Sequence, residues 1–228
     1  MNRLIANTLK CCMSVLVGAL VAGTAGTAQA GPLWEFSTAG NSFSNGTWNF
    51  ATSFAVNKDL SVSGLGYYAD PSNGQVADNA VALYLCSNAD CTGTGTLVAS
   101  TIVTNAYPLL GHFRYVTIAP VTLLAGQSYQ VAGVSAGDNY TWGDAGFATD
   151  SGISLIALNG QVGRWESGTT AEFLNYGQGD LGALDGYWGA NVFVGEPTFT
   201  EVPEPSELAL FGLGLVIIGS LTIRRRRA

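Results

Sequence analysis

Hydrophobic and polar positions alternate in short runs through most of the chain. The runs are rich in Val, Ile, Thr, Tyr and Phe, and turn-forming stretches such as residues 70–74 and 137–139 separate them. Helical periodicity is missing between the two ends, so the sequence predicts an all-β domain, a single β-sandwich, with a closed barrel as the alternative. We expect strands over residues 50–56, 60–68, 81–85, 97–104, 113–118, 128–134, 153–158 and 190–194.

Residues 1–30 have the three parts of a secretory signal peptide. A basic start precedes an apolar stretch over residues 13–22. The small residues Ala28 and Ala30 then form an A-x-A cleavage site. We therefore expect signal peptidase to cut before Gly31 and the mature chain to begin there.

The C-terminal end combines an uncharged apolar run, Leu208–Ile223, with a basic tail. As a helix this run spans about 24 Å at roughly 1.5 Å per residue, slightly less than a hydrocarbon core of about 30 Å. The positive-inside rule keeps a following basic cluster in the cytoplasm. The pattern predicts a transmembrane helix that transiently anchors the protein in the inner membrane, with the body on the other side. The cluster consists of Arg224, Arg225, Arg226 and Arg227.

The tetrad Val202, Pro203, Glu204 and Pro205 precedes this run. Tetrad, helix and arginine cluster together resemble the PEP-CTERM sorting signal of Gram-negative bacteria, over residues 202–228. The resemblance implies recognition by an exosortase, a membrane protease-transpeptidase that would cut near the tetrad. It also implies a destination at the cell surface or in the extracellular matrix of a biofilm. The expected organisation is a signal peptide (1–30), a β-sandwich (31–201) and the sorting signal (202–228).

The middle of the body, residues 60–137, carries a weaker resemblance. The order of four runs is similar to that of an uncharacterised jelly-roll-like domain of exported bacterial proteins. The runs are Leu60–Tyr68, Val81–Leu85, Gly95–Ser100 and Phe113–Val131. This resemblance implies a jelly-roll-like sandwich and transfers no catalytic residue.

The charge of the body is strongly acidic. Its cations are Lys58, Arg114 and Arg164, against fourteen acidic residues between Glu35 and Glu201, a formal charge of about −11. Binding to nucleic acid or to an anionic membrane surface is disfavoured. The excess of acidic residues is explained by solubility after export or, as the alternative, by binding of divalent cations.

Two cysteines remain in the body, Cys86 and Cys91. Export delivers them to an oxidising compartment, so we expect a disulfide that closes a small loop at a strand end. A zinc site would need further soft ligands, and the body has no other cysteine and one histidine.

Two short motifs match patterns of catalytic and nucleotide-binding sites, but the residues around them do not fit either kind of site. Gly133–Gly137 fits the G-x-S-x-G pattern around Ser135, but a loop follows it, and His112, the chain's histidine, precedes it. Only the order Asp90, His112, Ser135 fits a known triad order. Residues 177–182 fit G-x-G-x-x-G without a following helix signal, so we expect a loop there.

Oxygen-rich turns and aromatic clusters are the candidates for ligand binding. Calcium takes six to eight oxygen ligands, although no EF-hand spacing is present and solvated turns are the default. Aromatic rings beside polar groups suit sugar binding, with core packing as the alternative. The calcium candidates are Asp70, Asn73 and Asp78, or Asp138, Asp144 and Asp150; the sugar-binding candidates are Tyr140, Trp142, Tyr187 and Trp188.

These observations favour an exported, non-enzymatic protein with a structural or adhesive role at the surface or in the matrix. Exosortase and signal peptidase are its expected partners, and no cofactor other than calcium is expected. The alternative function is a carbohydrate-binding module that binds an extracellular polysaccharide, with or without calcium. A secreted hydrolase that uses Ser135 ranks third.

Overall fold

The computed structural model describes residues 30–72, 74–75, 77–158, 162–176 and 188–196, and these residues form strands, turns and loops. The all-β prediction is confirmed for this part of the chain. The strands are β1 (Gly31–Pro32), β2 (Trp34–Glu35), β3 (Asn41–Phe43), β4 (Trp48–Val56), β5 (Leu60–Tyr68), β6 (Asn79–Cys86), β7 (Gly95–Val103), β8 (Leu109–Leu110), β9 (Phe113–Leu123), β10 (Ser128–Val134), β11 (Tyr140–Trp142), β12 (Ala148–Thr149), β13 (Ile153–Leu155), β14 (Gly163–Ser167) and β15 (Ala190–Val194).

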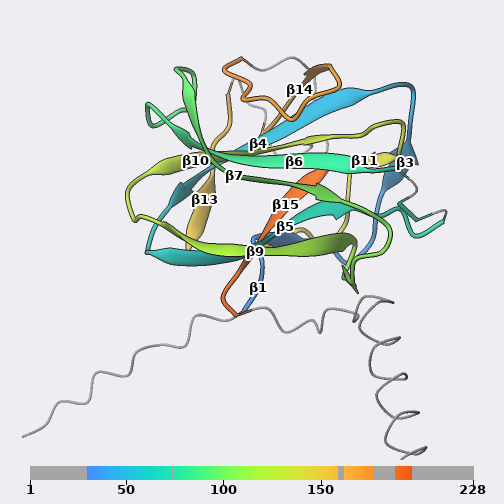
Figure 1. The fold of residues 1–228 in the computed structure, drawn as a ribbon, viewed down its shortest axis with the longest axis horizontal. Helices are drawn as coiled ribbons and strands as arrows, with labels where there is room; N and C mark the ends of the chain where they lie inside the picture. Colours follow the sequence, from blue (N-terminus) through green and yellow to red (C-terminus); the bar gives the residue numbers. More distant parts are fainter. Residues whose placement is uncertain (1–29, 73, 76, 159–161, 177–187, 197–228) are drawn as a thin grey trace, which may run out of the picture.

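Two antiparallel sheets pack against each other (Figure 1). One sheet has the order β1-β15-β5-β9-β8. The other has the order β13-β4-β10-β6-β7, and β14 pairs with β4 beyond β13 on the same edge. Two short ribbons, β3 with β11 and β2 with β12, complete the described strands.

The core lies between the two sheets and draws on both. Phe54, Leu83 and Val131 from the six-stranded sheet meet Leu65 and Val192 from the five-stranded sheet, and none of these side chains is exposed. Burying a side chain of this size contributes about 1.5–3 kcal/mol. The apolar positions that alternate with polar ones along these strands therefore face the same interior and form one continuous core.

Three of the predicted strands match the observed strands residue for residue. The strands predicted over residues 60–68, 128–134 and 190–194 coincide with β5, β10 and β15. β9 continues past Pro120 to Leu123 because its register with β5 shifts between Val62 and Gly64, and proline is tolerated at such an irregularity.

Both ends of the described body lie together. β1 pairs with β15, with Gly31 opposite Val194, and both ends of the body leave at the same side in Figure 1. Gly195, at a φ of +81°, packs so closely that a Cβ there would lie 2.8 Å from the Cα of Ala30. The expected cleavage site at Ala30 and Gly31 thus directly adjoins the first strand.

Candidate functional site

An ionised carboxylate joins three segments at one end of the two sheets. Asp70, which is 4% exposed, follows β5. It accepts hydrogen bonds from Asn139 Nδ2 (2.6 Å), from the backbone and hydroxyl of Ser72 (2.7 Å each) and from the hydroxyl of Ser42. Burial by itself raises the pKa of Asp70, but the hydrogen bonds from Asn139, Ser42 and Ser72 outweigh burial and lower the pKa to about 2.

The other acidic candidates also hold loops. Asp138 accepts a hydrogen bond from the backbone of Ala77 (3.0 Å), which draws its loop to the loop of Asp70. Asp144 accepts from the backbone of Gly40 (2.7 Å) and the hydroxyl of Thr141 (2.6 Å). Each carboxylate thereby fixes a turn next to β11.

The structure does not keep the members of each predicted calcium group together. The loops of Asp70 and Asp138 come together, whereas Asp150 lies beside β2, where its backbone donates to Leu33 (2.8 Å). Asp78 is exposed, and Asn73 lies outside the described residues. In the described part of the chain, no group of three or more His, Cys, Asp or Glu residues is placed to hold a metal ion. Calcium binding stays a prediction.

The ribbon of β3 and β11 carries an aromatic ledge, which we define as Phe43, Tyr140 and Trp142. The centroid of the Tyr140 ring lies 6.4 Å from that of Phe43 and 5.7 Å from that of Trp142. Tyr140 is buried against Phe50 (4.6 Å), Trp142 is half-buried and Phe43 is 48% exposed. Asn45 accepts from the Tyr140 hydroxyl at 3.1 Å. The sequence analysis omitted Phe43, which only the pairing with β11 brings into the ledge.

Trp188 requires a correction of the predicted sugar-binding set. Its backbone donates to Thr141 (2.9 Å), so the chain does run beside the ledge. Its ring, however, is only 1% exposed and packs on Trp34 (5.7 Å) and Phe147 (4.6 Å) in the core. A sugar could not reach it in this conformation. Tyr187 lies outside the described residues.

Ser135 and His112 have separate partners. The Ser135 hydroxyl is buried, accepts from the backbone of Trp48 (2.9 Å) and lies 3.3 Å from the carbonyl of Gly46, to which it donates. His112 pairs instead with Glu35 of β2, and its Nδ1 lies 2.8 Å from Glu35 Oε1. No hydrogen bond links the serine to the histidine among the described residues.

The surroundings of Ser135 also differ from those of a catalytic serine. A turn with positive φ at Ala136 (50°) and Gly137 (94°) follows it, where a nucleophile elbow continues into a helix. The geometry assigns Ser135 to holding this turn. The glycine motif over residues 177–182 lies outside the described residues.

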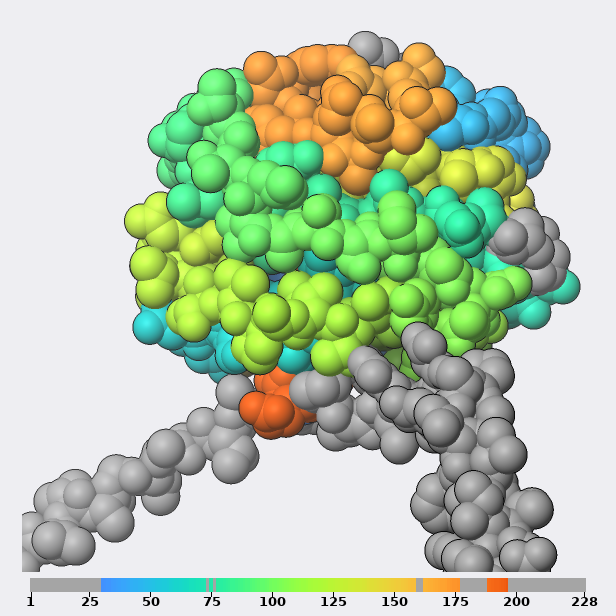
Figure 2. Space-filling view, viewed as in Figure 1, coloured from blue at the N-terminus to red at the C-terminus, as the bar shows by residue number. Residues whose placement is uncertain are grey.

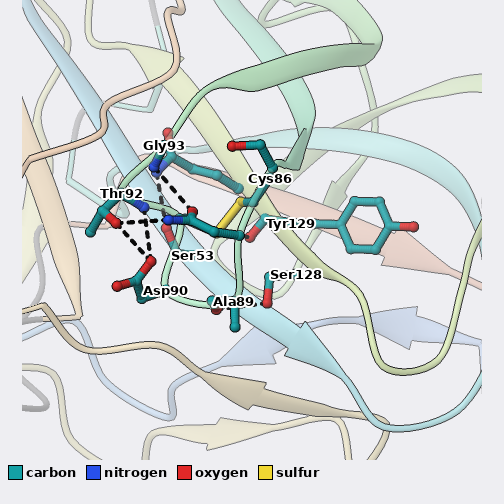
Figure 3. The surroundings of a disulfide bond; sticks show 12 residues. Ser53, Cys86, Ala89, Asp90, Thr92, Gly93, Ser128 and Tyr129 are labelled. Atoms are coloured by element: carbon teal, nitrogen blue, oxygen red, sulfur yellow. Dashed lines mark hydrogen bonds between the residues drawn. A yellow bond between two sulfur atoms is a disulfide. The ribbon is translucent and has the colours of Figure 1, made fainter.

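The predicted disulfide between Cys86 and Cys91 is confirmed, with Cα atoms 5.1 Å apart (Figure 3). It closes a loop at the end of β6 that has its own polar contacts. Asn88 Nδ2 donates to the Thr92 hydroxyl (2.9 Å), and the Ser128 hydroxyl donates to the carbonyl of Ala89 (2.8 Å). The disulfide is therefore one of several ties between this loop and the sheet.

Arg164, on β14, lies beneath this loop and is 1% exposed. Its Nη1 donates to the carbonyls of Cys91 (2.5 Å) and Leu174 (2.7 Å), and its Nη2 donates to the carbonyl of Asp90 (2.7 Å). Burial lowers the pKa of the guanidinium, and the negative charge of Asp90 partly offsets this. No pattern in the sequence indicated this role, because a charged residue is most often exposed.

A segment that we call the strap, residues 168–176, crosses the outer face of the six-stranded sheet (orange in Figure 2). Polar side chains of the sheet hold its backbone. Gln130 makes two hydrogen bonds with Leu174, donating to its carbonyl (2.9 Å) and accepting from its N–H (2.7 Å). The other contacts are Asn49 Nδ2 to the carbonyl of Glu172 (2.9 Å) and the Tyr84 hydroxyl to the carbonyl of Ala171 (2.7 Å).

Two hollows lined by described residues bear on the candidate sites. One, of about 530 Å³, is polar and lies beside β1, where Gly31, Glu35, Lys58 and Asp150 line it. The other is a groove of about 460 Å³ between the strap and the outer faces of β6 and β7. Neither hollow contains the aromatic ledge.

No protein-family model matches the chain, and no curated protein matches it either. No helix in the described ranges is long and apolar enough to cross a membrane. The signal-peptide residues before Ala30, the tetrad at 202–205, the apolar run and the arginine cluster lie outside the described residues, so these expectations stay predictions.

Proposed function

We propose that this chain is an exported, non-enzymatic structural protein of the cell surface or the extracellular matrix of a Gram-negative bacterium, processed by an exosortase. The observation that carries the proposal is the order of segments in the sequence. A predicted signal peptide precedes a β body that contains a disulfide, and a Val-Pro-Glu-Pro tetrad, an apolar run and an arginine cluster follow it in the sequence.

The arrangement of the body supports this proposal. Because β1 and β15 are paired neighbours, both membrane-directed segments attach at one pole of the body. The body would extend from that pole, with the strap on the side away from it in Figure 1. We also propose that the packed sheets form the jelly-roll-like β-sandwich that the resemblance over residues 60–137 implies.

The polar residues that could suggest an enzyme have structural partners. Ser135 holds a turn, Asp70 joins three segments, and Arg164 holds the disulfide loop. These contacts hold turns and loops of the body in place. This supports a structural role over a hydrolytic one.

Replacing Pro203, Glu204 and Pro205 together by alanine in the full chain tests the proposal. We expect the wild-type protein to lose its C-terminal segment and leave the inner membrane, and the variant to stay there uncut. Intact-mass measurement of the fractionated protein distinguishes these forms. Glu201→Ala, just outside the tetrad, serves as the matched control and should be processed normally. Normal processing of the triple variant would refute the exosortase part of the proposal.

Carbohydrate binding is the second candidate, and the exposed part of the aromatic ledge favours it. Phe43 and Trp142 present apolar surface next to the amide of Asn41, whose Nδ2 lies 3.4 Å from the carbonyl of Trp142. On a polysaccharide array, Trp142→Ala should weaken binding about five- to thirtyfold, as expected for an aromatic contact of about 1–2 kcal/mol. Phe147→Leu, a change in the core, should leave binding unchanged. Absence of saturable binding by the folded wild type would exclude this candidate.

A further inference from the structure

β7 is the outermost strand of the six-stranded sheet. Within the described residues it pairs with β6 on one side, and no strand pairs with its other side. An edge strand presents unpaired N–H and C=O groups that can accept another strand, and proteins commonly block such edges with charges or proline. β7 has neither over Gly95–Val103. By contrast, β9 carries Pro120 in the stretch that its outer neighbour β8 leaves unpaired.

The outer surface of β7 is apolar as well as unpaired. Leu97 is 55% exposed and Ile102 is 48% exposed. Both line the groove between the strap and the sheet, together with Tyr84 on β6. In Figure 2 the residues of β6 and β7 (green) extend across the front of the molecule below the strap. Backbone edge and apolar groove thus form one continuous surface.

Charge determines which occupant suits this surface. Among the described residues that line the groove, Glu172 is the one charged residue, and β7 and β6 are uncharged. An acidic peptide would find no complementary partner there. Two copies of this acidic body repel each other over most of their surfaces, and an uncharged strand on each copy is where they can meet with the least repulsion.

We propose that β7 pairs antiparallel with β7 of a second copy, about a twofold axis near Ser100. Such pairing joins the two six-stranded sheets into one continuous sheet. The same patch serves both copies, as a twofold interface requires. Leu97 and Ile102 of each copy would then lie over the joint and extend the apolar groove across it.

The size of the contact indicates when it forms. A nine-residue strand is about 30 Å long, and a single strand pair with its flanking side chains buries roughly 1,000 Å², at the low end of specific interfaces. Pairing is therefore expected to be weak in dilute solution. It is favoured where many copies are held on one membrane or in one matrix, because the effective concentration is higher there.

Cross-linking of the purified, oxidised full chain reconstituted in membranes tests the proposal without relying on export or exosortase processing. In Ser100→Cys, a mild oxidant should produce a disulfide-linked dimer, seen on a non-reducing gel. The mass of the linked peptide should show that the two introduced thiols, one from each copy, are joined to each other. Ser151→Cys, an exposed serine in a turn away from β7, is the matched control and should give no more dimer than wild type.

A second variant tests the surface itself. Adding Ile102→Lys to Ser100→Cys should lower the dimer yield roughly tenfold, because a charged side chain on an edge strand opposes pairing with a second strand. Leu124→Lys, at an exposed position outside β7, should leave the yield unchanged. The proposal is overturned if Ser100→Cys, with its Cys86–Cys91 disulfide intact, gives no dimer above wild type. It is also overturned if the adduct contains a different protein, or if Ile102→Lys has no effect.

Discussion

The two faces of the six-stranded sheet are held by different forces. The inner face meets the five-stranded sheet through apolar side chains such as Phe54 and Val131. The outer face, under the strap, is held mainly by polar side chains that bond to backbone groups. Gln130 and Arg164 are as fully buried there as the core leucines, with 0% and 1% exposure. On this sheet, polar side chains are buried because the strap covers them, and apolar side chains are buried because they pack between the sheets. Substitutions on the two faces should therefore affect stability in different ways.

The largest effect is expected on the inner face. Phe54 is fully buried, with its ring 6.2 Å from those of Trp34 and Tyr129. Phe54→Ala leaves a cavity and should lower the free energy of unfolding by about 3–5 kcal/mol. Urea unfolding of the exported protein, followed by tryptophan fluorescence, measures this. Phe54→Leu should lose distinctly less, and equal losses would show that cavity size is not the cause.

On the outer face, Arg164→Ala should cost about 2–3 kcal/mol, because the buried carbonyls of Cys91 and Leu174 and the partly buried carbonyl of Asp90 lose their donor. Hydrogen exchange should show faster exchange in both the disulfide loop and the strap, with the core strands less affected. Lys58→Ala, which removes an exposed cation, should change stability by less than about 0.5 kcal/mol. A change confined to one of the two segments would contradict the joint role of Arg164.

The disulfide should contribute slightly less than Arg164. Closing so short a loop restricts the unfolded chain by about 2 kcal/mol, so the pair Cys86→Ala and Cys91→Ala should lose about that much. Because Arg164 also holds the carbonyl of Cys91, the losses from the cysteine pair and Arg164→Ala should not add. A double-mutant cycle in urea measures the coupling, and strict additivity would mean that the two ties act on the loop independently.

The smallest expected effect on stability is that of Asp70, and it depends on pH. The pKa of Asp70 is about 2 in the folded protein, below the ordinary value of 3.8. Its carboxylate therefore stabilises the fold above about pH 4, and this contribution of about 1–2 kcal/mol is lost as pH falls from 4 toward 2. Unfolding free energies at pH 6 and pH 3 should differ less in Asp70→Asn than in wild type. An unchanged difference would contradict this assignment.

Several properties of the protein were set by local sequence and could be predicted from it. Strand alternation indicated the bounds of β5, β10 and β15, because side chains on a strand face opposite sides at each step. The spacing of Cys86 and Cys91 in a chain expected to be exported indicated the disulfide, because it requires only that a short loop close. The expected export and sorting segments likewise depend on local runs of apolar and basic residues.

Other features depended on contacts between distant segments. β14 was not predicted, because Arg164 and Glu166 interrupt its apolar pattern and it pairs with β4, far earlier in the chain. Trp142 and Trp188 look equally suited to sugar binding in the sequence, yet packing turns the Trp188 ring into the core and leaves Trp142 half-buried. Only the tertiary structure decided which polar and aromatic side chains are buried, because a strap supplied from elsewhere in the chain can satisfy their hydrogen bonds.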